Sequence, residues 1–249
     1  MNKLPQITLA FWIMKICATT LGETAGDLLS MTLDVGYAIS SMILISFFVL
    51  TLLGQIASNH YKPVLYWSVI LSTSTAGTTM SDFMDRTLGM GYAAGSATLI
   101  AILAATFYLW HRSEKSLSVH RISSIKGELF YWFAILFSNT LGTALGDFLA
   151  DDSGLGFAGG ALLIGSSIAV IALLHYTTRI SSVLLFWLAF VLTRPFGATL
   201  GDVLTKPHEK GGLDFGTVGS STVLLAVLLT LVAVATIYNR QRTATLPAQ

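Results

Sequence analysis

Four aspartates recur at one position of a repeated phrase, in a chain that is otherwise poor in charge. Each aspartate stands 15 residues after a tryptophan that itself follows an aromatic residue. The aspartates are Asp27, Asp82, Asp147 and Asp202, and the tryptophans are Trp12, Trp67, Trp132 and Trp187. Fifteen helical residues rise about 22 Å. We therefore expect four carboxyl groups at one depth of four helices.

The surroundings of these aspartates are predicted to be a membrane interior. The chain has 249 residues, of which 53% are hydrophobic and 11% charged, with a mean hydropathy of +0.71. Soluble domains carry about 25% charged residues. An ionisable group inside the hydrocarbon costs at least about 2.5 kcal/mol and indicates function by default. The alternative, which stays open, is that each aspartate caps a helix or bonds to a neighbouring helix.

Further oxygen-bearing side chains share a helix face with the aspartates. Positions 8, 11 and 15 after each tryptophan fall within one stripe of an α-helix. The stripe consists of Thr20, Glu23 and Asp27, then Thr75, Thr78 and Asp82, then Thr140, Thr143 and Asp147. The fourth repeat departs from it, with Pro195, Ala198 and Asp202. A polar stripe should face a bundle interior, so we expect the helices that carry it to form an inner layer, with the plainer apolar helices around them.

The chemistry of this stripe favours a cation. Carboxylate and hydroxyl oxygens suit Na⁺, Mg²⁺, Ca²⁺ or Mn²⁺. We predict that the four aspartates, with Glu23 and the threonines, bind a cation, and that the aspartates are the ligands if it is a metal. Protonation of a membrane carboxyl also removes the cost of burying its charge, so coupling to protons is compatible with the pattern.

Two basic residues break the fourfold pattern. Lys15 and Arg194 stand where the other repeats carry uncharged residues. Each is a possible counter-charge for the carboxylates. Lys15 is alternatively expected to extend to the membrane interface, as long basic side chains near helix ends do.

The elements that must position these residues are eight apolar segments, each about as long as a membrane crossing of roughly 20 residues. They lie at about 8–30, 37–57, 64–85, 91–110, 129–150, 156–175, 182–204 and 216–238. No segment is left over for a soluble domain. We predict an all-α membrane protein with eight transmembrane helices in a single membrane domain, residues 1–249.

The chain is a fourfold internal repeat, with units at about 8–60, 63–112, 128–178 and 182–240. A glycine stands ten residues after every tryptophan, and a second small residue four further on. Such pairs favour close helix packing, whereas tryptophans at helix ends typically anchor at the membrane interface. Each unit is predicted to be a helix hairpin, so all four enter the membrane in the same direction as parallel repeats.

Four tandem two-helix units, each with a tryptophan and a Gly-xxx-small-Asp phrase, resemble a family of bacterial membrane proteins described as a fourfold repeat of unknown function. The resemblance covers essentially the whole chain. It implies a bacterial inner-membrane protein and no particular activity.

Charge is distributed unequally between the two sides of the predicted bundle. Basic residues such as Lys62 and Arg112 gather on the side of the termini, while Asp34, Asp152 and Glu209 fall on the other. Because Lys and Arg concentrate in short cytoplasmic loops, we expect both termini in the cytoplasm. The expected partners are the lipid bilayer and a small cation. No nucleic acid is indicated, and the oligomeric state stays open.

Three classes of function compete. A transporter for a small inorganic cation, with a divalent metal and proton coupling as options, fits the unequal repeats better than a symmetric channel filter. A structural or partner-binding membrane subunit is second. An intramembrane enzyme is third and is not expected, because the chain has no His-Glu-xx-His helix, Gly-x-Ser-x-Gly turn or phosphate loop. No cofactor is expected beyond a possible bound metal cation.

Overall fold

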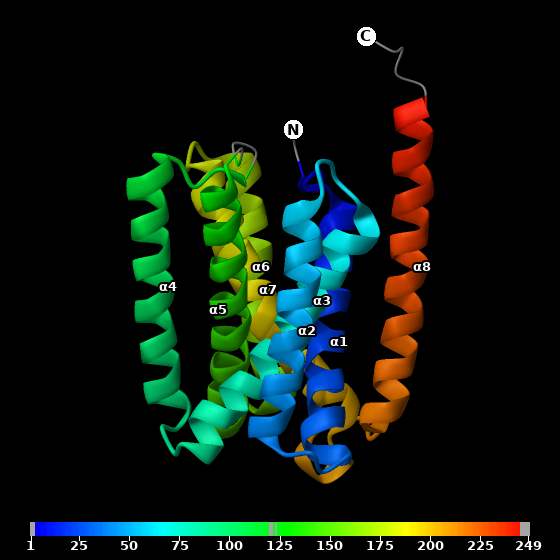
Figure 1. Cartoon of the computed structure of the whole chain (residues 1–249). Coiled ribbons are helices and arrows are strands. Elements are labelled where there is room, and N and C mark those ends of the chain that lie inside the picture. Colours follow the sequence, from blue (N-terminus) through cyan, green and yellow to red (C-terminus); the bar gives the residue numbers. More distant parts are fainter. Residues whose placement is uncertain (1–2, 120–121, 123, 245–249) are drawn as a thin grey trace.

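The chain folds into a bundle of long helices that run side by side (Figure 1). The computed structural model describes residues 3–119, 122 and 124–244. The long helices are α1 (Leu9–Asp27), α2 (Tyr37–Ala57), α3 (Pro63–Asp82), α4 (Tyr92–Glu114), α5 (Ile125–Asp147), α6 (Gly156–Thr177), α7 (Ser182–Thr205) and α8 (Gly216–Ala244). The predicted all-α class is confirmed, since the described residues form helices and no strand.

The odd-numbered helices form the inner layer, as the polar stripe predicts. α1 packs against α3 and α7, and α5 packs against the same two helices, so the four make a closed ring. Most of the buried side chains belong to these helices, whereas α2 and α6 bury only a few of theirs. The start of α1 and the end of α8 lie at the same end of the bundle (Figure 1).

The outer layer departs from the predicted hairpins. Each even helix packs mainly on the odd helix of the following repeat: α2 on α3, α4 on α5, α6 on α7, and α8 back on α1. The two helices of one repeat are therefore not a packed pair. This arrangement interlocks the four repeats, because each repeat covers its neighbour and the last one closes on the first.

The connection inside each repeat helps to explain this offset. The first three inner helices end in a π-helical turn, η1 (Leu28–Thr32), η2 (Phe83–Thr87) and η4 (Phe148–Asp152), and the fourth connection holds a short 3₁₀ turn, η5 (His208–Lys210). The glycine at the start of each even helix has a positive φ, a conformation that favours glycine. These glycines are Gly36, Gly91, Gly156 and Gly216. The turn thus directs the second helix away from the first.

Glycines set the spacing of the inner ring. The glycine ten residues after each tryptophan faces one residue of the next inner helix so closely that a methyl group would collide with it. The four pairs are Gly22 with Ser74, Gly77 with Asn139, Gly142 with Arg194, and Gly197 with Thr19. The packing role expected for these glycines is confirmed, and the same contact is used four times around the ring.

The repeated aromatic pairs form a second ring, at the end of the bundle that holds the start of α1. The aromatic residue before each tryptophan contacts the tryptophan of the next inner helix, in the pairs Phe11–Trp67, Tyr66–Trp132, Tyr131–Trp187 and Phe186–Trp12. The hydroxyl groups of Tyr66 and Tyr131 also share a 2.7 Å hydrogen bond. The interface anchoring expected for the tryptophans is wrong for Trp67, Trp132 and Trp187, which are buried because this ring closes the inner bundle.

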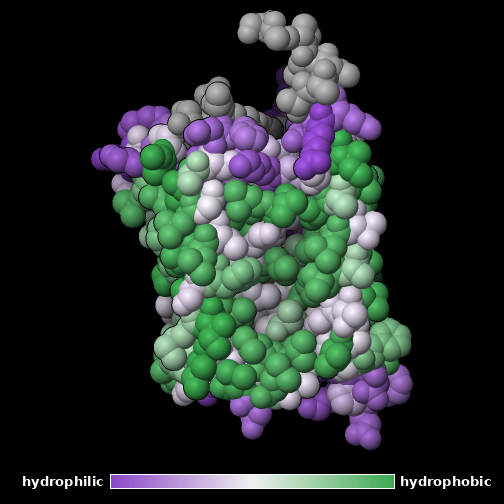
Figure 2. All heavy atoms as spheres, turned by 45° about the vertical axis from the view of Figure 1, so that its right-hand side comes forward, coloured by the Kyte–Doolittle hydropathy of each residue, from purple (hydrophilic) through white to green (hydrophobic). Residues whose placement is uncertain are grey.

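The face of the molecule shown in Figure 2 is apolar between two hydrophilic ends. Among the described residues, six helices are long and apolar enough to cross a membrane: α2, α4, α5, α6, α7 and α8. α1 and α3, whose many polar side chains are buried inside the bundle, are not among them. Six of the eight predicted crossings are thereby supported.

The glycine contact leads to a first prediction. In Gly77→Ala the new methyl group would lie 2.9 Å from backbone atoms of Asn139 and Thr140, which cannot move aside as a flexible side chain can. We expect a loss of about 1–3 kcal/mol, the usual cost of overpacking. The measurement is the temperature at which half of the detergent-purified protein stays monodisperse in size-exclusion chromatography.

Gly219→Ala in α8 is the matched control, since nothing lies within 4 Å of the added methyl group. A Gly77→Ala protein as heat-resistant as the wild type would contradict the role of this contact.

Candidate functional site

The four aspartates close the inner ring at the end opposite the aromatic residues. They are the last α-helical residues of α1, α3 and α5, and in α7 the equivalent Asp202 lies three residues before the end. All four side chains are buried. None of the first three caps the π-helical turn that follows it. For these three aspartates the capping alternative is therefore not the arrangement adopted, and their carboxylates point to other partners.

Two basic residues bridge the aspartates in pairs. Arg86 lies 2.9 Å from Asp82 and 3.1 Å from Asp147. Lys206 lies 3.1 Å from Asp27 and 3.2 Å from Asp202. Each base thus joins the aspartate of its own repeat to that of the next repeat. The ring of four predicted from the sequence is brought together as two bridged pairs.

Arg86 and Lys206 were missed by the sequence reasoning, although a signal was present. Each stands four residues after its aspartate, one helical turn further on. The equivalent residues of the other two repeats, Met31 and Asp151, are not basic. This alternation marks the second and fourth repeats as those that supply the bridging bases.

Lys206 is the residue directly after α7, and its ammonium group has a raised pKa. Burial lowers the pKa of Lys206, but the carboxylates of Asp202 and Asp27 raise it by more, so the net shift is upward. A raised pKa means that the stabilisation by this bridge is complete below the ordinary lysine pKa of about 10.4 and is lost only as the pH rises beyond it. Lys206 is therefore charged at neutral pH.

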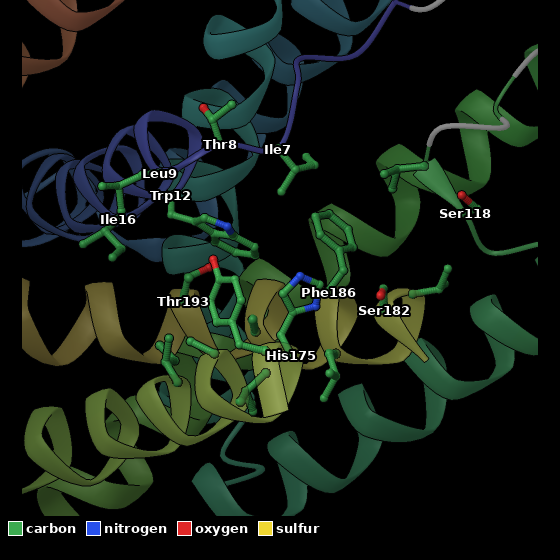
Figure 3. Close-up of a pocket in the computed structure, with 18 of the residues that line it drawn as sticks. Ile7, Thr8, Leu9, Trp12, Ile16, Ser118, His175, Ser182, Phe186 and Thr193 are labelled. Atoms are coloured by element: carbon green, nitrogen blue, oxygen red, sulfur yellow. The ribbon is translucent and has the colours of Figure 1, made fainter. Parts of the chain in front are cut away.

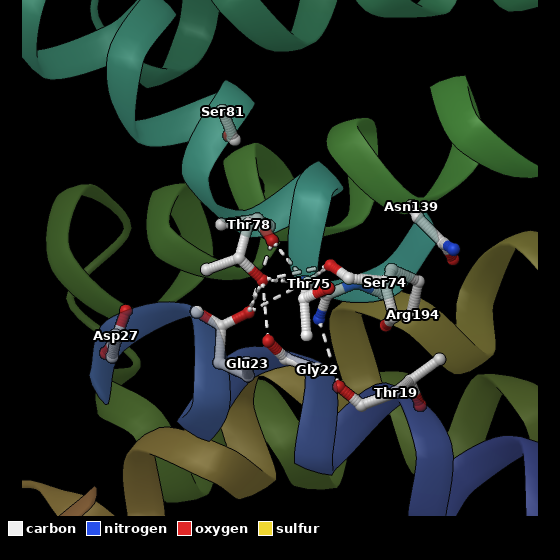
Figure 4. Close-up of polar contacts among 12 residues, drawn as sticks. Thr19, Gly22, Glu23, Asp27, Ser74, Thr75, Thr78, Ser81, Asn139 and Arg194 are labelled. Atoms are coloured by element: carbon white, nitrogen blue, oxygen red, sulfur yellow. Dashed lines mark hydrogen bonds and ion pairs between the residues drawn. The ribbon is translucent and has the colours of Figure 1, made fainter. Parts of the chain in front are cut away.

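Arg194 occupies the centre of the inner ring (Figure 4). Its side chain is fully buried, and its guanidinium lies 2.9 Å from the carboxylate of Glu23. It also donates hydrogen bonds to the hydroxyl groups of Thr78 and Thr143 and to the backbone carbonyl of Thr19. The predicted counter-charge role is thus realised for Arg194, which contacts all three other inner helices.

Glu23 connects the buried guanidinium of Arg194 to the ring of aspartates. Its Oε2 accepts hydrogen bonds from Thr78 and Thr143, each 3.2 Å long. Glu23, Asp147 and Asp202 can each present one carboxylate oxygen such that the three oxygens lie within 4.8 Å of one another. Three converging carboxylate oxygens are a ligand set that hard cations accept, so this acidic triad could hold a metal ion.

The remaining threonines of the predicted stripe are placed differently. Their hydroxyl groups bond to carbonyl oxygens of their own helix rather than to the carboxylates. The bonds run from Thr20 to Ile16, from Thr75 to Leu71 and Ser72, and from Thr140 to Leu136. The stripe is therefore divided: its half near the aspartates faces the ionic centre, and its other half is satisfied by the backbone.

Lys15 takes neither of its expected positions. It is fully buried and forms no ion pair among the described residues. Its ammonium lies 3.4 Å from the side-chain oxygen of Asn139 and 4.2 Å from the centre of the Phe190 ring. It does not extend to the interface because it starts on the inner face of α1, where the aromatic ring closes the way out.

Comparison with known proteins supports the repeat and names no activity. The family described as Repeat of Unknown Function (DUF347) matches residues 10–61, 65–116, 130–181 and 185–241. This confirms the resemblance inferred from the motif spacing. Neither a curated protein nor a solved structure matches the chain.

The central ion pair leads to a second prediction. Arg194→Met leaves Glu23 buried without its counter-charge, and breaking a buried pair in this way costs about 3–5 kcal/mol. Glu23→Gln removes the orphaned charge, so we expect the double variant to regain much of the lost stability. The readout is the resistance of the detergent-purified protein to heat and denaturant.

Arg240→Met, which removes an exposed arginine of α8, is the control and should behave as the wild type. A double variant no more stable than Arg194→Met alone would show that the two residues do not act as a pair.

Proposed function

We propose that this chain, which belongs to the Repeat of Unknown Function (DUF347) family, carries a small cation across a membrane. The observation that carries the proposal is the convergence of three buried carboxylates, Glu23, Asp147 and Asp202, within 4.8 Å. Like charges this close repel one another, and a bound cation or bound protons offset the repulsion. A site whose carboxylates must hold either a cation or protons is suited to exchange one for the other.

The charge balance among the carboxylates and the bases paired with them favours a divalent cation or two protons. Five carboxylates meet in the inner bundle, and three bases form ion pairs with them, which leaves two negative charges without a base. The carboxylates are Glu23, Asp27, Asp82, Asp147 and Asp202, and the bases are Arg86, Arg194 and Lys206. Asp85 is outside this set, since its carboxylate bonds to Ser81 and packs against Gly95 of α4. A fourth base, the buried Lys15, lies 12 residues before Asp27 on α1, about 18 Å away along the helix axis, and pairs with none of the five carboxylates.

The two ends of the inner bundle differ in a way that suits controlled access. Arg86 and Lys206 are partly exposed, at 34% and 25% of their side chains, so they lie between the aspartates and the outside. A cation that reaches the aspartates from this end competes with the two bases for the same oxygens. At the other end the aromatic ring closes the bundle, and passage there requires the inner helices to move apart.

The proposal includes a location and an orientation. α1 and α3 cross the membrane with the other six helices, with their polar side chains buried inside the bundle, which makes eight crossings. The chain lies in the bacterial inner membrane with both termini in the cytoplasm, because basic loop residues gather at that end. The aspartates then lie towards the outer side.

A structural role is the second candidate, and one observation favours it. Every one of the four aspartates already has a basic partner within 3.2 Å. Such a network could serve only to hold the helices of a membrane subunit together. The two candidate functions predict different results when the charge of an aspartate is removed and the protein stays folded.

Orientation is tested by labelling. We expect a cysteine at Glu209, which is exposed in η5, to react with an impermeant thiol reagent in intact cells when Cys17 is replaced by alanine. A cysteine at Lys62, at the other end, should react only after permeabilisation. The opposite result would reverse the orientation.

Transport is tested in proteoliposomes. We expect the wild type to move at least one of Mg²⁺, Mn²⁺, Ca²⁺ and Na⁺, and Asp147→Asn to lower its rate by about tenfold or more, since losing about 1.4 kcal/mol of cation binding already costs tenfold in affinity. Asp152→Asn, which alters an exposed carboxylate five residues along, is the matched control. Size-exclusion chromatography must show each variant folded.

The outcomes separate the two candidates. Loss of transport in folded Asp147→Asn supports the carrier. If the wild type moves none of the four ions, or if asparagine at all four positions transports as well as aspartate, the carrier proposal fails and the structural role replaces it.

A further inference from the structure

A large groove lies on the side of the bundle, away from the aspartates. It is formed by the first half of α1, the last half of α6, the first half of α7 and the segment 117–119 before α5. Its volume is about 760 Å³. Trp12, His175, Phe186 and Thr193 turn toward this common space from three different helices (Figure 3).

The length of the groove matches one leaflet of a bilayer. Its lining runs along α7 from Ser182, the first residue of the helix, to Thr193. Eleven helical residues rise about 16 Å, and half of the hydrocarbon thickness is about 15 Å. Along α6 the lining likewise reaches from Tyr176 inward to Ile168. The groove thus extends from the end of the bundle to near its middle.

The chemistry of the walls changes along this length. The inner part is lined by aliphatic side chains such as Ile16, Ile168 and Ile171, and by Thr193, whose hydroxyl donates to the carbonyl of Phe190. Polar groups gather near the mouth, where Thr8, Ser118 and Ser182 are found. Apolar walls with polar groups at one end suit an amphiphile that lies parallel to the helices.

A basic residue and two helix N-termini lie near the mouth. Arg179 is exposed in the loop between α6 and α7, with lining residues on both sides of it in the sequence. The N-termini of α1 and α7 also reach the groove, at Leu9 and Ser182. Helix N-termini carry partial positive charge and favour phosphate groups. The mouth is therefore complementary to an anionic headgroup.

The groove has the size of a small-ligand site. Its volume of about 760 Å³ lies within the range of about 300–1,000 Å³ that is usual for small ligands.

We propose that this groove binds an anionic phospholipid, with an acyl chain along α6 and α7 and its phosphate beside Arg179. The lipid comes from the leaflet at the end of the bundle that holds the termini. This binding does not depend on cation transport, because the groove shares no residue with the acidic triad.

The test uses the whole chain in nanodiscs that contain equal amounts of phosphatidylglycerol and phosphatidylcholine, followed by native mass spectrometry after release into detergent. The wild type should retain one phosphatidylglycerol in preference to phosphatidylcholine. Ala172→Trp, which places a large side chain in the groove, should lower this occupancy by about fivefold or more, a loss of roughly 1 kcal/mol. Arg179→Glu should abolish the preference for phosphatidylglycerol while still allowing lipid to bind.

Two matched controls lie outside the groove. Ala101→Trp is on an exposed face of α4, and Arg240→Glu is on α8; both should retain lipid as the wild type does. The proposal is overturned if the wild type shows no preference between the two lipids, or if folded Ala172→Trp retains as much lipid as the wild type. Co-purification of a polypeptide that the Ala172→Trp change displaces would overturn it as well.

Discussion

A buried guanidinium must find partners for its charge and its donors, and the inner bundle is built around that need. Arg194 contacts Glu23 and Thr19 of α1, Thr78 of α3 and Thr143 of α5. Removing charge from water costs several kcal/mol per ion, which is offset only by close and well-directed partners. The positions of four helices are thus coupled through one side chain, and Gly142 provides the space in which the base of that side chain lies.

The close spacing of the helices makes this coupling possible, and it also explains the outer layer. Glycines let neighbouring inner helices approach until side chains such as Ser74 and Asn139 touch a helix backbone. Most side chains of the inner helices are then turned inward, and only part of their surface is left exposed. The even helices supply an apolar outer face, and because each one packs on the following repeat, the inner ring is held together around its whole circumference.

Much of the fold and part of the site could be predicted from the sequence. The repeat, the inner layer and the convergence of the aspartates follow from a residue spacing that recurs four times along the chain. The pairing of Asp82 with Asp147 through Arg86 could not be predicted in this way, because it depends on which repeat lies next to which in space. The burial of Trp132 was missed for the same reason. A tryptophan at a helix end gives the same sequence pattern whether it contacts lipid or the neighbouring helix.

The departures from fourfold symmetry divide the bundle into two halves. In the part of the chain that the structure describes, the ion pairs at the aspartate end and at the centre follow two seams: Arg86, after α3, pairs with Asp147 of α5, and Glu23 and Asp27 of α1 pair with Arg194 of α7 and with Lys206 after it. At the opposite end, Lys3 before α1 pairs with Glu128 of α5. The contacts of α1 with α3 and of α5 with α7 rely instead on hydrogen bonds of hydroxyl groups: Thr78 donates to Glu23, and Thr143 accepts from Arg194. Breaking a buried ion pair such as Arg194–Glu23 costs about 3–5 kcal/mol, more than the roughly 1.5–3 kcal/mol of a hydrogen bond to a charged group. If the inner helices separate to pass a cation, the seams that lack ion pairs open first, and the two bridged pairs move as units.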